Sequence, residues 1–149
     1  MIRYLDDWKV GETFVTRGRT IGESDVSAFA ALTWDVHPNH TDAQAMEKSV
    51  FGERIAHGLF GIAIAHGLLM QLGIVTNNSI ALLSVDNWTF KKPIFFGDTV
   101  HVKITVDDIK FSRSKNDRGV MKLYFEVINQ KDEVCQVGYK SLMMKREIA

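Results

Sequence analysis

The hydrophobic pattern divides the chain into a helical first part and a strand-forming second part. Residues 55–74, IAHGLFGIAIAHGLLMQLGI, are almost wholly apolar and do not alternate as a strand would. A helix that is apolar on all sides lies either in a membrane or at the centre of a domain. The two histidines, one glutamine and four glycines of this stretch favour the second. We expect a buried central helix from about His57 to Leu72, ended by Gly73.

After residue 79 the period of the pattern changes to two, which is typical of β-strands. Every second residue from Val100 to Val106 is apolar, for example, and polar neighbours lie between. The turn-forming sequences KNDRG and NQKDE separate the later runs. The pattern predicts four long strands, at 80–90, 99–112, 119–129 and 133–145.

One long apolar helix followed by antiparallel strands predicts an α+β fold, in a single domain that spans residues 1–149. We expect the sheet to wrap around the helix. Alternation along the strands predicts that one face of the sheet is covered and that the other face is polar.

The sequence before the central helix predicts a short strand within residues 12–21 and then a helix. Ser24 and Asp25 can cap the start of this helix, because short polar side chains accept hydrogen bonds from free amides. Apolar residues recur at helical spacing as far as Leu32. Pro38 then disfavours a helical conformation for the residue before it, so the helix should end near Asp35.

A second short helix is expected just after His40. Thr41 is followed three residues later by Gln44, which resembles a capping box.

Composition narrows the range of functions. The chain has 149 residues, 46% of them hydrophobic, as in an ordinary globular domain. Lys and Arg total 18, as do Asp and Glu, so the formal charge is zero and no basic excess indicates nucleic-acid binding. Cys135 is the one cysteine, and we expect a buried, inert thiol. The first residues contain no long apolar run, so we expect no signal peptide and a cytoplasmic protein without a membrane partner.

Candidate chemistry gathers in the stretch WDVHPNH, residues 34–40. Asp35 lies at the predicted end of one helix and His40 just before the next. Histidine exchanges protons near neutral pH, and a nearby carboxylate can orient it and raise its pKa. Such a pair is suited to general acid–base work on a water molecule.

The sequence IAHG, at the start of the apolar helix, contains a second candidate group, Gly58. The first amides of a helix are free, and the macrodipole is positive there. Glycine has no side chain, so a ligand oxygen can approach its N–H closely. These are the requirements of an oxyanion hole.

Three separated segments together resemble the MaoC-like hydratases, which include the R-specific enoyl-CoA hydratases and have a hot-dog fold. The segments are TIGESDVSAFAALTWDVHPNHTD, FGERIAHG and FKKPIFFGDTV, and the resemblance runs from about residue 8 to residue 145. The family's motif is an aspartate, a histidine five residues on and a glycine at the start of the central helix, and Asp35, His40 and Gly58 occupy these positions.

The resemblance implies reversible addition of water across the α,β double bond of an acyl thioester carried on coenzyme A or acyl carrier protein. Asp35 and His40 would hold one water, which attacks the β-carbon while a proton returns to the α-carbon. The Gly58 N–H would hold the thioester oxygen as it gains enolate charge. The reaction implies no metal or redox cofactor, and the carrier is part of the substrate.

The chain also departs from the family pattern. The family usually reads Asp-x-Asn-Pro-(Ile or Leu)-His, so His37 replaces an asparagine and Asn39 replaces an apolar residue. Some members have a serine near the thioester eight residues after the glycine, where this chain has His66. Together with His57, these residues are candidates for the substrate pocket. A structural role in packing or in the loop is the alternative for the three histidines.

Other interpretations stay open at this stage. Asp35 and the nearby histidines could bind zinc or iron, but His37 and His40 flank a proline in a loop, unlike the ligands on one face of a helix, and we expect no metal. A hot-dog acyl-CoA thioesterase and a non-catalytic subunit that binds acyl thioesters are the alternative functions. Hot-dog sheets usually join edge to edge, which protects an exposed strand. We therefore expect a homodimer or a dimer of dimers.

Overall fold

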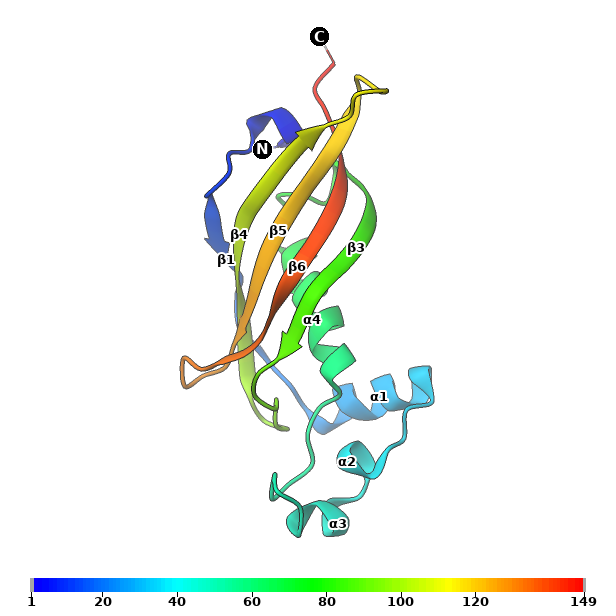
Figure 1. Cartoon of the computed structure of the whole chain (residues 1–149). Coiled ribbons are helices and arrows are strands. Elements are labelled where there is room, and N and C mark those ends of the chain that lie inside the picture. The colour runs from blue at the N-terminus through cyan, green and yellow to red at the C-terminus, as the bar shows by residue number, and fades with distance from the viewer. Residues whose placement is uncertain (1, 149) are drawn as a thin grey trace.

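The computed structural model, which describes residues 2–148, is an antiparallel sheet curled around one long helix (Figure 1). The strand order is β1-β4-β5-β6-β3, with β2 paired to β4 beside this path. All of these pairs are antiparallel. The elements of the sheet are β1 (Thr13–Val15), β2 (Arg19–Thr20), β3 (Ser79–Phe90), β4 (Thr99–Phe111), β5 (Arg118–Ile128) and β6 (Val134–Lys145), and a short 3-10 helix, η1 (Leu5–Asp7), precedes them.

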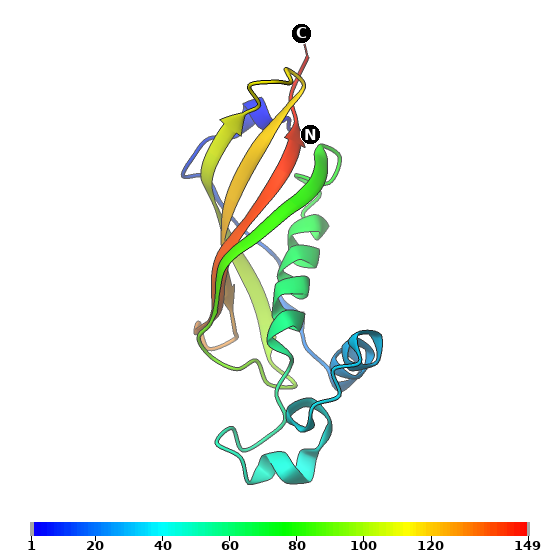
Figure 2. The ribbon, with the colours of Figure 1, turned by 45° about the vertical axis from the view of Figure 1, so that its right-hand side comes forward.

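The apolar stretch forms the central helix α4, Gly58–Gln71, which lies along the concave face of the sheet (Figure 2). Its C-cap is Leu72, and Gly73 follows with a φ of 71°, a left-handed conformation that favours glycine. The predicted central helix and the predicted α+β arrangement are both confirmed. Within residues 2–148 there is no helix long and apolar enough to cross a membrane.

The core lies between α4 and the inward-facing side chains of β4, β5 and β6. On β4 every second residue from Val100 to Val106 is buried, as the alternation predicted. Cys135 on β6 is also fully buried, and burial raises the pKa of its thiol to about 11. The expectation of a buried thiol is confirmed, and at neutral pH this thiol stays protonated and poorly nucleophilic.

The segment before α4 forms three helices below the end of the sheet, near the start of α4 (Figure 2): α1 (Glu23–Thr33), α2 (Pro38–Thr41) and α3 (Ala43–Glu47). The Asp25 carboxylate accepts a hydrogen bond of 2.9 Å from the amide of Gly22, the N-cap of α1. Ser24 lies inside the first turn, so the prediction that it also caps the helix is wrong.

Two further details of this segment differ from the prediction. The cap of α3 is Asp42, whose carboxylate accepts a bond of 2.9 Å from the Ala45 amide. Thr41, the predicted cap, instead donates its hydroxyl to the Val36 carbonyl at 2.9 Å. The stretch 12–21 forms two short strands, β1 and β2, where one was predicted.

The edge strand β3 does not follow the prediction of a polar outer face. It pairs with β6 on one side and has no partner strand on the other among the described residues. Four of its apolar side chains are 39–46% exposed: Ile80, Leu82, Leu83 and Val85. The sheet therefore ends in an apolar edge.

Candidate active site

Asp35 lies in a tight loop between α1 and α2. The preceding residue, Trp34, adopts a left-handed conformation with a φ of 64°, which is uncommon for a residue other than glycine. The Asp35 amide donates to the Thr33 hydroxyl at 3.3 Å, and the Asp35 carboxylate accepts the His37 amide at 3.4 Å. Strained backbone of this kind concentrates at functional sites. The loop leaves the Asp35 carboxylate exposed to solvent.

His40 lies within the one-turn helix α2, which was not predicted, and the predicted short helix follows it as α3. Its Nδ1 lies 2.7 Å from the Ile55 carbonyl oxygen. A carbonyl only accepts, so Nδ1 carries the hydrogen and Nε2 of the neutral ring is a free acceptor. The Ile55 amide in turn donates to the Asn39 carbonyl at 3.0 Å. These two bonds fix His40 to the segment that leads into α4.

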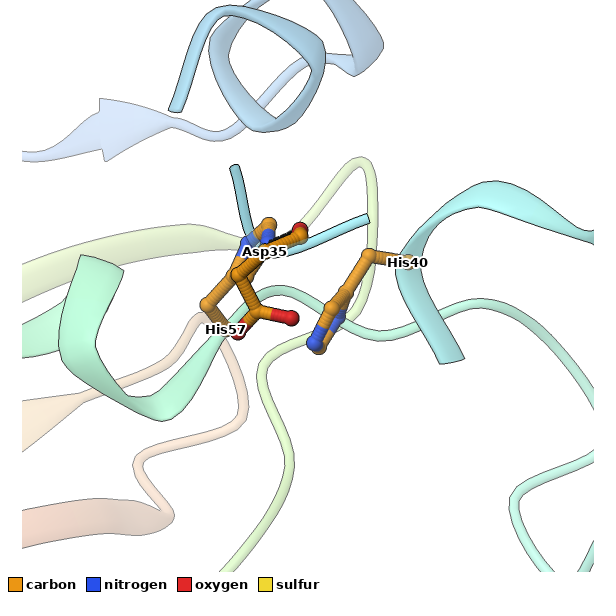
Figure 3. A group of neighbouring side chains, drawn as sticks. All are labelled: Asp35, His40 and His57. Carbon is orange, nitrogen blue, oxygen red and sulfur yellow. Dashed lines mark hydrogen bonds between the residues drawn. The ribbon is translucent and has the colours of Figure 1, made fainter. Parts of the chain in front are cut away.

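Asp35 and His40 meet beside the start of α4 (Figure 3). An oxygen of the Asp35 carboxylate and a ring nitrogen of His40 lie within 4.8 Å of each other. A water that made a hydrogen bond of about 2.8 Å to each would span this separation. The geometry thus fits one water held between two proton acceptors.

The pKa of His40 is lowered from its ordinary value. Partial burial is the main cause, because it penalises the charged ring, and the neighbouring His57 acts in the same direction. The hydrogen bond to Ile55 and the Asp35 carboxylate oppose the change without reversing it. The Asp35 carboxylate thus acts upward on this pKa, as expected, but burial outweighs it. Neutral His40, the form that can accept a proton, is favoured near pH 7.

His57 is buried beneath the Asp35 loop, with 3% of its surface exposed. Its Nε2 lies 2.8 Å from the Asp35 backbone carbonyl (Figure 3), and its ring stacks on the His40 ring with centroids 3.6 Å apart and an angle of 25°. The other nitrogen, Nδ1, is buried without a hydrogen-bond partner within residues 2–148.

The same cluster could be considered as a metal site, because Asp35, His40 and His57 each place one potential ligand atom within 4.8 Å of the others. Zinc binds in the plane of an imidazole at about 2 Å from nitrogen. Stacked rings direct their nitrogen lone pairs side by side, so an ion shared by His40 and His57 would lie outside both ring planes. The stacked geometry disfavours a metal shared by the two histidines.

A cavity of about 540 Å³ opens beside His40 and Gly58, within the size range of ligand pockets. Its wall is mostly apolar and comes from the loop before α4, from α4 itself and from the segment after β3. The lining residues are Asn39, His40, Phe51, Ile55, Ala56, Gly58, Leu59, Phe90, Lys91, Lys92, Pro93, Ile94 and Gln136.

Gly58 is the first residue of α4, as predicted, and its amide is one of those that the helix itself leaves without an acceptor. A Cβ at this position would lie 2.8 Å from Cε1 of Phe90, so a larger residue there would require the half-exposed Phe90 ring to shift. The carbonyl of Gly58 accepts a bond of 3.3 Å from the Gln136 side chain on β6. Gly58 therefore presents its backbone to the cavity.

Of the four candidates for the substrate pocket, Asn39 lines the cavity, whereas the three histidines lie outside its lining among the described residues. His37 is the N-cap of α2, and its Nδ1 accepts the Asn39 amide at 3.1 Å. His66 lies half-buried two turns along α4. Its pKa is lowered by burial and by the charge of Lys140.

Polar residues beneath α4 were not singled out from the sequence. Gln136 and Lys140 face inward from β6 and are 3% and 0% exposed. Trp88 donates its indole N–H to the Gln136 side chain at 3.0 Å. The sequence could have indicated them. Both polar residues lie at alternate positions of β6 together with Leu142 and Met144, and alternate residues of a strand point to the same face.

Two lysines lie at the cavity rim. Lys92 forms an ion pair with Glu133, whereas Lys91 has no ion-pair partner within residues 2–148. Arg54 lies outside the lining and pairs with Glu23 at 2.9 Å. Among the described residues that line the cavity, Lys91 is thus the lysine free to meet an anionic ligand.

Comparison with known proteins places the chain among proteins of related sequence and structure. Protein MaoC of Klebsiella aerogenes is 34% identical over 118 residues, which are 78% of this chain and 35% of that protein. This chain therefore spans about a third of the length of that relative. The (R)-specific enoyl-CoA hydratase of Rhodospirillum rubrum is 32% identical over 106 residues, 71% of each chain.

Solved structures agree with the sequence relatives. The MaoC-like dehydratase from Rhodospirillum rubrum superposes with a TM-score of 0.84 at 28% identity and covers 99% of both chains. At the level of fold alone, Rv0216 of Mycobacterium tuberculosis, a double hot-dog protein, has a TM-score of 0.76 at 19% identity over 98% of this chain and 45% of that one. The predicted hot-dog fold is confirmed. The family model described as "MaoC like domain" matches residues 7–129, and the chain belongs to this family.

Proposed function

We propose that this protein catalyses the reversible addition of water to the α,β double bond of an acyl thioester. The observation that carries the proposal is the separation of the Asp35 carboxylate and the His40 ring, whose acceptor atoms lie within 4.8 Å beside the cavity. Two acceptors at this distance can bind both hydrogens of one water and direct its oxygen lone pair at a substrate in the cavity.

The proposed reaction uses three groups of the chain. The water held by Asp35 and His40 loses a proton to this pair as its oxygen bonds to the β-carbon. The electrons of the double bond move toward the thioester oxygen, which gains enolate charge. The Gly58 N–H donates to that oxygen at the positive end of the α4 dipole. The pair then returns a proton to the α-carbon, so that all atoms of the water are added.

The family relatives support an enoyl thioester as the substrate. The relative from Rhodospirillum rubrum is named an (R)-specific enoyl-CoA hydratase, and that of Methylorubrum extorquens a 3-hydroxybutyryl-CoA dehydratase. We extend this to the present chain as an R-specific hydratase of enoyl groups carried on coenzyme A or acyl carrier protein. Both carriers have phosphates, which Lys91 at the cavity rim can meet. No metal or redox cofactor takes part.

We also propose that two copies of the chain associate through β3. This strand ends the sheet with five exposed large apolar side chains, Phe90 and the four named above, and such an edge is a template for another strand. A second copy placed edge to edge would pair the open backbone groups and cover the apolar residues. A homodimer, or a dimer of such dimers, follows.

The direct test is turnover of a short enoyl-CoA by the purified protein. Loss of the conjugated ultraviolet absorbance reports hydration, and chiral analysis of the product should give the R-3-hydroxyacyl thioester. Parallel assays use a thiol reagent with the enoyl-CoA and with its saturated analogue. The reagent detects the free coenzyme A that hydrolysis would release. Release of free coenzyme A with no hydration would establish the thioesterase alternative. Tight binding without either reaction would establish a non-catalytic subunit.

A further inference from the structure

His57 contacts both members of the proposed water site from one buried position. Its Nε2 lies 2.8 Å from the Asp35 carbonyl oxygen, and its ring lies 3.6 Å from the His40 ring, centroid to centroid. Because a carbonyl oxygen only accepts, Nε2 must carry the hydrogen. His57 thus contacts Asp35 through a hydrogen bond and His40 through ring stacking.

The His57 ring is packed between helices α1 and α4. The ring of Phe29 on α1 meets it edge-on with centroids 5.0 Å apart, and Phe60 on α4 packs against Phe29 at 5.5 Å. The His57 backbone begins α4, with its carbonyl accepting the Phe60 amide at 3.1 Å. Helices α1 and α4 therefore fix a ring that in turn contacts Asp35 and His40.

Apart from the bond of 2.9 Å from the Thr41 hydroxyl of α2 to the Val36 carbonyl, few hydrogen bonds restrain the Asp35 loop relative to His40. His40 is tied to Ile55, two residues before His57, through a bond of 2.7 Å. Asp35 is held locally by Thr33, the last residue of α1, and by His37, the N-cap of α2. The bond from His57 is the one long-range hydrogen bond that the structure shows to Asp35 within residues 2–148.

We infer that His57 is a positioning residue that sets the gap between the Asp35 carboxylate and the His40 ring. Its N–H determines where the Asp35 main chain lies, and its ring face determines the tilt of His40. The inference rests on the proposed hydration function. It assigns His57 no contact with substrate, since the residue is buried outside the cavity lining.

Two substitutions separate the two contacts. His57→Gln keeps an amide N–H at about the reach of Nε2 but removes the ring face. His57→Phe keeps the ring face but removes the donor. Each variant should lower kcat for an enoyl-CoA by tenfold to a hundredfold, on the order expected for a misplaced catalytic group, with KM changed by less than about threefold. Val75→Ala, fully buried beyond the far end of α4 from the site, is the matched control for lost packing and should keep the kcat of the wild type.

Nuclear magnetic resonance of His40 supplies a readout that does not depend on turnover. The His40 ring proton signal should move strongly in His57→Gln, which loses the ring current, and much less in His57→Phe. The Asp35 and Val36 amide signals should show the opposite order. If wild type turns over and both variants retain its kcat once corrected for the folded fraction, the inference is wrong and the proposed function stands. If wild type is inert, the proposed function fails, and unchanged His40 and Asp35 signals in both variants would overturn the positioning role as well.

Discussion

The ammonium group of Lys140 donates a hydrogen bond of 2.8 Å to the backbone carbonyl of Ile62, in the middle of α4. Lys140 is fully buried, and its Nζ lies 4.9 Å from the ring centroid of Phe125 and 5.3 Å from that of Trp88. Burial lowers its pKa to about 8. Lys140 thus links the central helix to the sheet, and no carboxylate within residues 2–148 forms an ion pair with it.

This burial predicts a pH-dependent stability. In the unfolded chain the lysine has its ordinary pKa of about 10.4, so between pH 8 and that value the unfolded state binds more protons than the folded state. The free energy of unfolding should therefore rise with pH across this window, by up to about 3 kcal/mol from this group. Urea unfolding of wild type and Lys140→Met at several pH values measures the difference. A rise of equal size in both proteins would contradict the assignment to Lys140.

The lowered pKa of His40 predicts the acid side of the pH–rate profile. Burial favours the neutral ring, which is the form that accepts a proton from water. The acid limb of kcat/KM should therefore have its midpoint below about 6.5, the ordinary value for histidine. Initial rates between pH 4.5 and about 8 measure it. A midpoint above the ordinary value would mean that the Asp35 carboxylate outweighs burial.

Removal of metals should leave hydration unchanged. The stacking of His40 on His57 disfavours a metal shared between them, and the proposed chemistry relies on protein acceptors and a backbone N–H. Dialysis against a strong chelator, followed by assay with and without added zinc or iron, is the measurement. If activity is lost and returns with one of these ions, the Asp35–His40 cluster is a metal site and not a site for a protein-held water.

The apolar edge predicts a dimer that a charge on β3 disrupts. Leu83→Lys places an ammonium among the exposed apolar residues, and light scattering should then give a mass near the 16.9 kDa of one chain instead of twice that value. Val15→Lys is the matched control, because Val15 is 56% exposed on β1 at the opposite edge of the sheet. It should leave the dimer intact. If Val15→Lys alone gives monomers, the interface lies at β1.

The fold could be predicted from the sequence because one long stretch is wholly apolar and the later runs alternate between apolar and polar residues. The all-round apolar stretch forms α4, and the alternating runs form β4, β5 and β6 within about two residues of the predicted ends. The exposed face of β3 could not be predicted in the same way. Alternation indicates which residues avoid water, but it does not distinguish a core from the surface that a second chain covers.

The candidate site was predicted in part. Asp35, His40 and Gly58 could be selected by residue type and spacing, and the structure brings His40 to Asp35 and to the cavity that Gly58 lines. The direction of the His40 pKa depends on how deeply the ring is buried, which spacing does not reveal. The contacts of His57 were also out of reach, because they join residues 22 positions apart through a side chain and a backbone carbonyl.

The most direct test of the central claim compares wild type with Asp35→Asn, His40→Ala and the double variant in hydration of a short enoyl-CoA. If the two residues hold one water as a unit, each single variant should lose activity by orders of magnitude, and the double variant should lose little more. Circular dichroism confirms that all four proteins are folded. Losses that multiply in the double variant, or single variants that retain the wild-type rate, would contradict a shared catalytic water.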